Sequence, residues 1–158
     1  MTATLIRRDD LIETVRAALQ YISVYHPADY IAHLARAYQR EQSAAAKDAI
    51  AQILTNSRMS AEGKRPMCQD TGIVNVFLDV GMDVRWDGFG SSSIDDAVNE
   101  GVRRAYLDPD NKLRASVVDD PLFTRRNTKD NTPAVVSMKL VPGNTLGVGV
   151  AAKGGGSE

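Results

Sequence analysis

The chain has 158 residues, a hydrophobic fraction of 43%, and 19 basic against 20 acidic side chains, for a net charge of -1. This length allows one domain with a real core, and the composition is ordinary for a soluble globular protein. The balanced charge gives no reason to expect nucleic acid or a membrane as a partner, no apolar run reaches the roughly 18 residues of a membrane span, and a lone cysteine suits a cytoplasmic location.

Residues 9–58 have the apolar spacing of three helices. Asp10 and Glu13 predict a capping box at the start of the first helix. The pair His26-Pro27 ends that helix, because proline suits the first turn of the next one. Ser43 is expected to cap the third helix. Three such helices need a surface to pack on, since short helices are marginal alone.

The character of the sequence changes near residue 60. The pattern predicts a strand over 73–84 with a turn at Gly81, a loop over 86–90 and a helix capped by Ser93. Further on it predicts an irregular polar segment and two more strands, at 114–133, 134–141 and 145–152. We therefore expect an α+β (mixed α/β) fold, in which an N-terminal helical segment, residues 1–60, packs on a small mixed sheet within residues 61–158.

The stretch 64–72 contains the single cysteine, Cys68, next to an amide, Gln69, and a carboxylate, Asp70. A thiolate is a nucleophile and a soft metal ligand, and the basic pair before it favours that form. The alternative is a buried, inert thiol, but these polar neighbours are unusual around a core residue.

A nucleophilic cysteine requires a base, usually histidine. The two histidines, His26 and His33, lie far upstream in the helical segment and are read as helix-boundary and helix-surface residues. That leaves metal ligation at Cys68, with partner ligands outside this chain.

Three glycines follow Lys153 at the end of the last predicted strand. Without side chains, Gly154 and Gly155 could bring several N–H donors close to an anion, or they could belong to a flexible tail. Arg114 and the pair Arg125-Arg126 could hold carboxylates through paired hydrogen bonds, or they could be ordinary surface residues.

Four motifs occur in a fixed order: Lys-Arg-Pro-Met-Cys-Gln-Asp-Thr-Gly at 64–72, Leu-Arg at 113–114, two Asn-Thr pairs within 127–134, and Ala-Lys-Gly-Gly-Gly-Ser at 152–157. In this order they resemble the class I, iron–sulfur-dependent fumarate hydratases and the related L-tartrate dehydratase α subunit. The resemblance spans nearly the whole chain and is sharpest at the cysteine and glycine motifs.

The resemblance implies reversible hydration of fumarate to L-malate and a 4Fe–4S cluster held by three cysteines, whose open iron acts as a Lewis acid. Cys68 matches the first cluster ligand. Gln69, Asp70 and Arg114 match substrate-binding residues, and Gly154 and Gly155 match a loop that touches substrate through its backbone. None of the residues in this chain matches a catalytic base, which is expected in a C-terminal part beyond it.

Two further cluster cysteines are expected outside this chain, since it holds one cysteine. We therefore expect residues 61–158 to be the front part of a larger cluster-binding domain, completed by the remainder of the enzyme or by a β subunit, and a homodimer when complete. The chain alone is expected to hold no intact cluster and to be inactive. Two alternatives come from other classes: a non-catalytic scaffold or interaction domain, and a redox-sensing thiol at Cys68.

Overall fold

The computed structural model describes residues 3–68, 72–111 and 113–154. Helices and small mixed sheets confirm the α+β prediction. Contacts divide the chain into two compact units, one with residues 1–20 and 69–158 and the other with residues 21–68. Within the described part of the chain, no helix is both long and apolar enough to cross a membrane.

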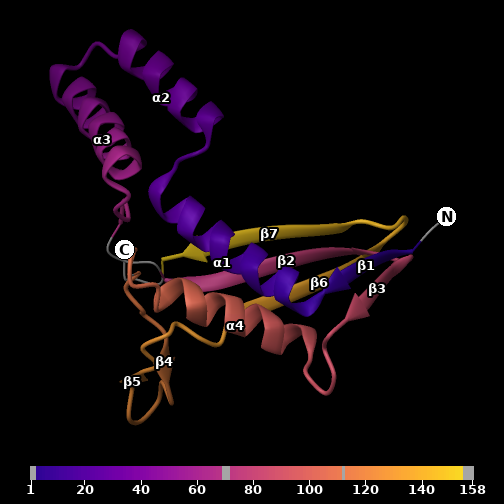
Figure 1. Cartoon of the computed structure of the whole chain (residues 1–158). Helices are drawn as coiled ribbons and strands as arrows, with labels where there is room; N and C mark the ends of the chain where they lie inside the picture. Colours follow the sequence, from indigo (N-terminus) through magenta and orange to yellow (C-terminus); the bar gives the residue numbers. More distant parts are fainter. Residues whose placement is uncertain (1–2, 69–71, 112, 155–158) are drawn as a thin grey trace. The chain divides into compact units, whose positions relative to one another are not determined.

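A three-stranded sheet forms the centre of the first unit (Figure 1). Its middle strand is β2 (Ile73–Gly81), which pairs in parallel with β6 (Val135–Val141) and antiparallel with β7 (Leu146–Lys153). These are the strands that the sequence predicts, with bounds shifted by one to three residues. Since Ile73 pairs with Lys153, the start of β2 and the end of β7 lie at the same end of the sheet.

One face of β2 forms the core, because alternate side chains of a strand point to opposite faces. Its buried residues are Val74, Val76, Leu78 and Val80. Figure 1 shows α1 (Arg8–Val24) and α4 (Ile94–Tyr106) lying over the sheet. Each helix supplies an apolar stripe: Leu11, Ile12, Val15 and Leu19 from α1, and Ala97, Val98, Val102, Ala105 and Tyr106 from α4.

The ends of the two helices are held differently. Ser93 caps α4 as predicted, in a full capping box with Asp96. The capping box predicted for Asp10 and Glu13 is wrong. α1 begins at Arg8, and the carboxylate of Asp10 accepts two hydrogen bonds from the Arg7 guanidinium, at 2.9 and 2.8 Å. Because the helix begins two residues before Asp10, this carboxylate lies inside the first turn and bonds to Arg7 instead of capping the helix.

A second, two-stranded parallel sheet pairs β1 (Thr4–Arg7) with β3 (Val84–Asp87). The sequence analysis misses β1 and places Trp86 and Asp87 in a loop, which is wrong. It also runs the first strand on to Val84, whereas the chain turns at 82–83 and starts β3 there. β1 and β3 pair with each other across about 80 residues of sequence, and a local pattern cannot reveal so distant a partner.

In the second unit, α2 (Ala28–Arg40) packs against α3 (Ala44–Gly63). Ser43 caps α3 as predicted, accepting the N–H of Ala46. The predicted apolar stripe of α2 is half-buried at most, and Tyr30 remains 41% exposed. α2 therefore forms as a helix, but none of its residues is fully buried in this unit.

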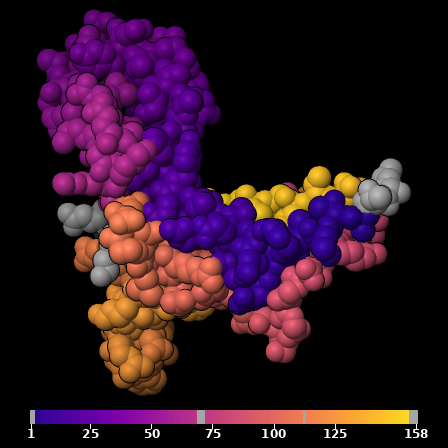
Figure 2. Space-filling model, viewed as in Figure 1, coloured from indigo at the N-terminus to yellow at the C-terminus, as the bar shows by residue number. Residues whose placement is uncertain are grey.

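The segment after α4 is mostly irregular, as predicted, except for a short hairpin of β4 (Val118–Asp119) and β5 (Arg126–Asn127). This hairpin projects from the sheet unit in Figure 2. At its tip, Leu122 and Phe123 are more than 80% exposed.

Replacing Gly101 by Ala tests the contact between α1 and α4. A Cβ at this position would lie 2.7 Å from the carbonyl oxygen of Ile12 and 2.8 Å from the Cβ of Val15. We expect Gly101→Ala to lower the free energy of unfolding by about 2 kcal/mol, although alanine favours a helix. Gly63→Ala is the control, since its Cβ would meet nothing closer than 4.0 Å. Thermal unfolding of both variants measures this, and equal stabilities would contradict the packing.

Glu100 on α4 tests the acid dependence of stability. Hydrogen bonds from Arg103 and Arg104 lower the pKa of its carboxyl from 4.5 to about 2. The folded-state pKa is the lower one, so this stabilisation is present above about pH 4.5 and is lost as pH falls toward 2. Glu100→Gln should cost no more than about 1 kcal/mol at neutral pH and flatten the stability curve in that window. Urea unfolding at several pH values measures it, and a curve parallel to that of the unaltered protein would refute it.

Candidate functional site

The last residue of the cysteine motif, Gly72, lies next to the start of the glycine motif at one end of the three-stranded sheet. Gly72 closes the first motif, and a Cβ on it would lie 1.8 Å from the carbonyl oxygen of Lys153 and 2.6 Å from the Cα of Gly154. Its φ of 60° is also in the left-handed region that favours glycine. Backbone therefore packs directly on backbone at this point, and only glycine fits.

A buried asparagine ties a third segment to the same place. Asn131 is fully buried, and its side-chain Nδ2 donates to the carbonyl oxygen of Gly72 at 2.9 Å. Its Oδ1 accepts the N–H groups of Ser116, at 2.6 Å, and Val117, at 3.0 Å. The segment that carries Arg114 is therefore held against the end of the cysteine motif.

Cys68 is the last residue of the second unit and its thiol is exposed. The residue before it, Met67, is anchored through both backbone groups: its N–H donates to the Ser23 carbonyl at 2.9 Å, and its carbonyl accepts from Asn56 Nδ2 at 3.3 Å. The ammonium of Lys64 lies over the Tyr25 ring, 4.3 Å from its centre. The backbone is thus fixed just before a thiol that remains accessible.

Of the six predicted site residues, the structure describes Cys68, Arg114 and Gly154. Gln69, Asp70 and Gly155 lie outside the described residues. Arg114 is exposed, immediately after the buried Leu113.

The alternative arginines, Arg125 and Arg126, lie at the start of β5. Arg126 is engaged by Asp119 at 2.6 Å, which raises the pKa of its guanidinium. Arg125, before it, has a left-handed backbone with a φ of 48°. An arginine already bound to a carboxylate is a poorer receptor for a second one.

The sequence analysis includes Asn131 only in one of the two Asn-Thr pairs within 127–134 and misses its role in joining the segments. One signal could have found it. Asparagine is enriched in the left-handed conformation, and a following Thr-Pro pair restricts the chain, so a special turn could be expected there.

The one cysteine of this chain can supply one thiolate ligand of an iron–sulfur cluster. Such clusters are held by cysteine thiolates, and Cys68 is exposed and free to serve as one. Among residues 3–68, 72–111 and 113–154, no three His, Cys, Asp or Glu side chains gather to hold a metal ion. His33 is exposed, and the Nδ1 of His26 lies 3.0 Å from the Ser57 hydroxyl.

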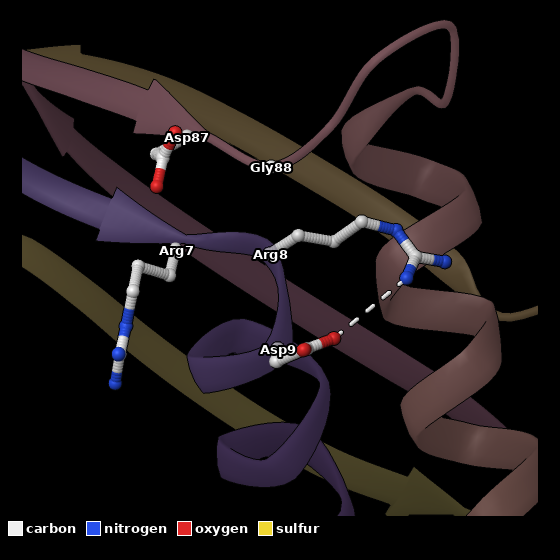
Figure 3. Close-up of a pocket in the computed structure, with 5 residues that line it drawn as sticks. All are labelled: Arg7, Arg8, Asp9, Asp87 and Gly88. Atoms are coloured by element: carbon white, nitrogen blue, oxygen red, sulfur yellow. Dashed lines mark ion pairs between the residues drawn. The ribbon is translucent and has the colours of Figure 1, made fainter.

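A polar pocket of about 330 Å³ lies where β1 and β3 meet the start of α1 (Figure 3). It is lined by Arg7, Arg8, Asp9, Asp87 and Gly88. Arg7 binds Asp10, and Arg8 lies 3.8 Å from Asp9, so both cations already have carboxylate neighbours. None of the three described site residues, Cys68, Arg114 and Gly154, lines this pocket.

Gly72→Ala tests the contact that joins the two motifs. The added methyl group would overlap the Lys153 carbonyl and force a left-handed backbone on alanine. We expect a loss of more than about 3 kcal/mol in the free energy of unfolding. Gly149→Ala on the same strand pair is the control, because its Cβ would lie an ordinary 3.6 Å from Phe77. Chemical denaturation compares the two, and a Gly72→Ala variant as stable as the control would rule out the close approach.

Comparison with known proteins shows the family to which the chain belongs. Residues 12–158 match the family model described as fumarate hydratase (Fumerase). A Methanocaldococcus jannaschii protein provisionally named L(+)-tartrate dehydratase subunit alpha is 34% identical over 123 residues, which are 78% of this chain and 40% of that protein. The anaerobic class I fumarate hydratase of Escherichia coli is 32% identical over 106 residues, and the aerobic one 34%.

The 106 residues shared with each Escherichia coli enzyme are 67% of this chain but 18% of that enzyme. The chain therefore spans two fifths of the first relative and less than a fifth of the others. The family match nevertheless covers all but the first eleven residues. The chain belongs to the fumarate hydratase (Fumerase) family.

Proposed function

We propose that this chain supplies part of the active site of a hydro-lyase that reversibly hydrates fumarate to L-malate. The observation that carries the proposal is the pairing of Ile73 with Lys153. It brings the end of the cysteine motif against the glycine motif, in a chain that belongs to the fumarate hydratase family.

The polar groups of this chain would bind the dicarboxylate. Arg114 would hold one carboxylate through paired hydrogen bonds. Gln69 and Asp70 would contact the substrate from the cysteine motif, and the backbone N–H groups of Gly154 and Gly155 would add donors from the other side. Donors fixed in this way can stabilise charge that develops on the carboxylate next to the reacting carbon.

Cys68 would provide one of three thiolate ligands of a 4Fe–4S cluster, and the other two would come from outside these 158 residues, which contain one cysteine. When bound, the cluster supplies Lewis acidity toward substrate oxygen atoms. The anchored backbone at Met67 supports this role, because a metal ligand benefits from a fixed position. The remaining ligands and the catalytic base would lie in a further region of the enzyme or in a β subunit, and the active form would be a homodimer.

The division of the chain follows the same proposal. Residues 1–60 would serve as the N-terminal helical segment, and residues 61–158 as the front part of the cluster-binding domain. The active enzyme would be cytoplasmic.

A tartrate dehydratase is the second candidate. The Methanocaldococcus jannaschii relative aligns over 123 residues, against 106 for the Escherichia coli enzymes, and covers more of this chain. Both substrates are small dicarboxylates that lose or gain water, so the same arginine and amide groups would serve. Comparing the rates of the assembled enzyme on L-malate and on tartrate separates the two.

Cys68→Ser in the assembled enzyme tests the proposal. We expect hydration activity to fall more than about 100-fold, because even supporting residues of metal sites cost 10–100-fold. The iron content and the visible absorption of the cluster should fall with it. Met59→Ser is the control, since it removes another exposed sulfur side chain from the same unit.

Two outcomes would favour the other classes of function. A Cys68→Ser enzyme with full activity and unchanged iron would contradict the cluster and favour a scaffold. Activity that survives the substitution but no longer responds to oxidants would favour a redox-sensing thiol.

A further inference from the structure

Asn131 has a position that few side chains could occupy. It is 0% exposed, and its backbone has a φ of 61°, in the left-handed region that asparagine tolerates. At that point the fold requires an acceptor for two N–H groups and, on the same planar group, a donor for one carbonyl. A carboxamide meets both needs at once, with oxygen on one side and NH₂ on the other.

The three bonds connect segments that are distant in sequence. Ser116 and Val117 are 15 and 14 residues before Asn131, whereas Gly72 is 59 residues before it. Arg114 lies two residues before Ser116, and Gly72 directly follows the segment with Gln69 and Asp70. A buried carboxamide therefore fixes the spacing between Gly72 and the segment that follows Arg114.

Asn131 is itself held on a rigid support. The Ala134 N–H, three residues later, donates to the side chain of Asn99 at 2.8 Å. Asn99 belongs to α4, whose apolar stripe is buried. Movement of the Arg114 segment would thus have to break bonds to a support that is fixed by the core.

We propose that Asn131 is a positioning residue for the hydro-lyase reaction, which sets the place of Arg114 relative to Gly72 at the end of the three-stranded sheet. This inference rests on the proposed function. Because Arg114 would bind a substrate carboxylate before the reaction as well as during it, loss of its position should appear mainly in KM. A residue needed only for folding would change the amount of active enzyme and leave KM unaltered.

Two substitutions in the assembled enzyme separate the side-chain bonds from the backbone. Asn131→Gly keeps the left-handed backbone and removes all three bonds, so KM for fumarate should rise about tenfold at every pH. Asn131→Asp keeps the acceptor but turns a second carboxylate oxygen toward the Gly72 carbonyl, which repels it. A protonated carboxyl can donate there instead, so the rise in KM should be about tenfold near pH 8 and should shrink as pH falls toward about 5.

Asn75→Asp is the matched control. The Nδ2 of Asn75 donates to the Ile73 carbonyl at 3.1 Å, so this variant also sets a carboxylate against a backbone carbonyl, but one two residues before it on β2 and not one in the segment that carries Arg114. Its KM should change less than about twofold. Combining Asn131→Asp with Arg114→Ala should raise KM no further than Arg114→Ala alone, because coupled residues are not additive. Additive effects, or a KM unaltered by both Asn131 variants, would overturn the proposal.

If both Asn131 variants fail to fold, hydrogen exchange in the unaltered enzyme decides. Adding fumarate should slow exchange of the Ser116 and Val117 amides, which donate to Asn131, and unchanged exchange would overturn the proposal. An unaltered enzyme that neither hydrates fumarate nor dehydrates tartrate would instead refute the proposed function. The two failures are therefore distinguishable.

Discussion

The sheet unit depends on one backbone contact, where Gly72 passes the Lys153 carbonyl and the Gly154 Cα without room for a side chain. This approach lets β2 pair with β7 to the very end of both strands, from Leu146 to Lys153. It therefore fixes the register of the sheet. In a strand, a slip of one residue would move the buried face of β2 to solvent, so the register also protects the core.

The buried polar side chains described in the same unit connect separate segments of the chain. Asn131 connects three segments, and the carboxylate of Asp108, 8% exposed, binds Arg16 of α1 at 2.6 Å. Both side chains are buried, and each would cost about 1–3 kcal/mol if it lacked its hydrogen-bond partners. One of them, Asn131, bonds to Gly72, which packs against Lys153 and Gly154 at the end of the sheet. Order at the proposed site is thus a consequence of the same bonds that order the fold.

The sequence predicts most elements that have a local signature. Ser43 and Ser93 mark helix starts correctly, since a cap bonds to residues within three positions. β2, β6 and β7 are found from apolar runs between turns. β1 and β3 are missed or misplaced because their pairing partner is about 80 residues away. The predicted cap at Asp10 fails for a different, local reason, because α1 begins two residues earlier and the carboxylate binds Arg7.

The sequence by itself determined the chemical inventory: one thiol, a glycine triplet, an arginine after a leucine, and motifs that mark the family. Residue types and short spacings are enough for that, because they are properties of the chain before it folds. Only the tertiary structure decided that Gly72 abuts Lys153 and that Asn131 is buried against Gly72 and Ser116. Such contacts arise from strand pairing and packing between residues 15 to about 80 positions apart, which no local pattern encodes.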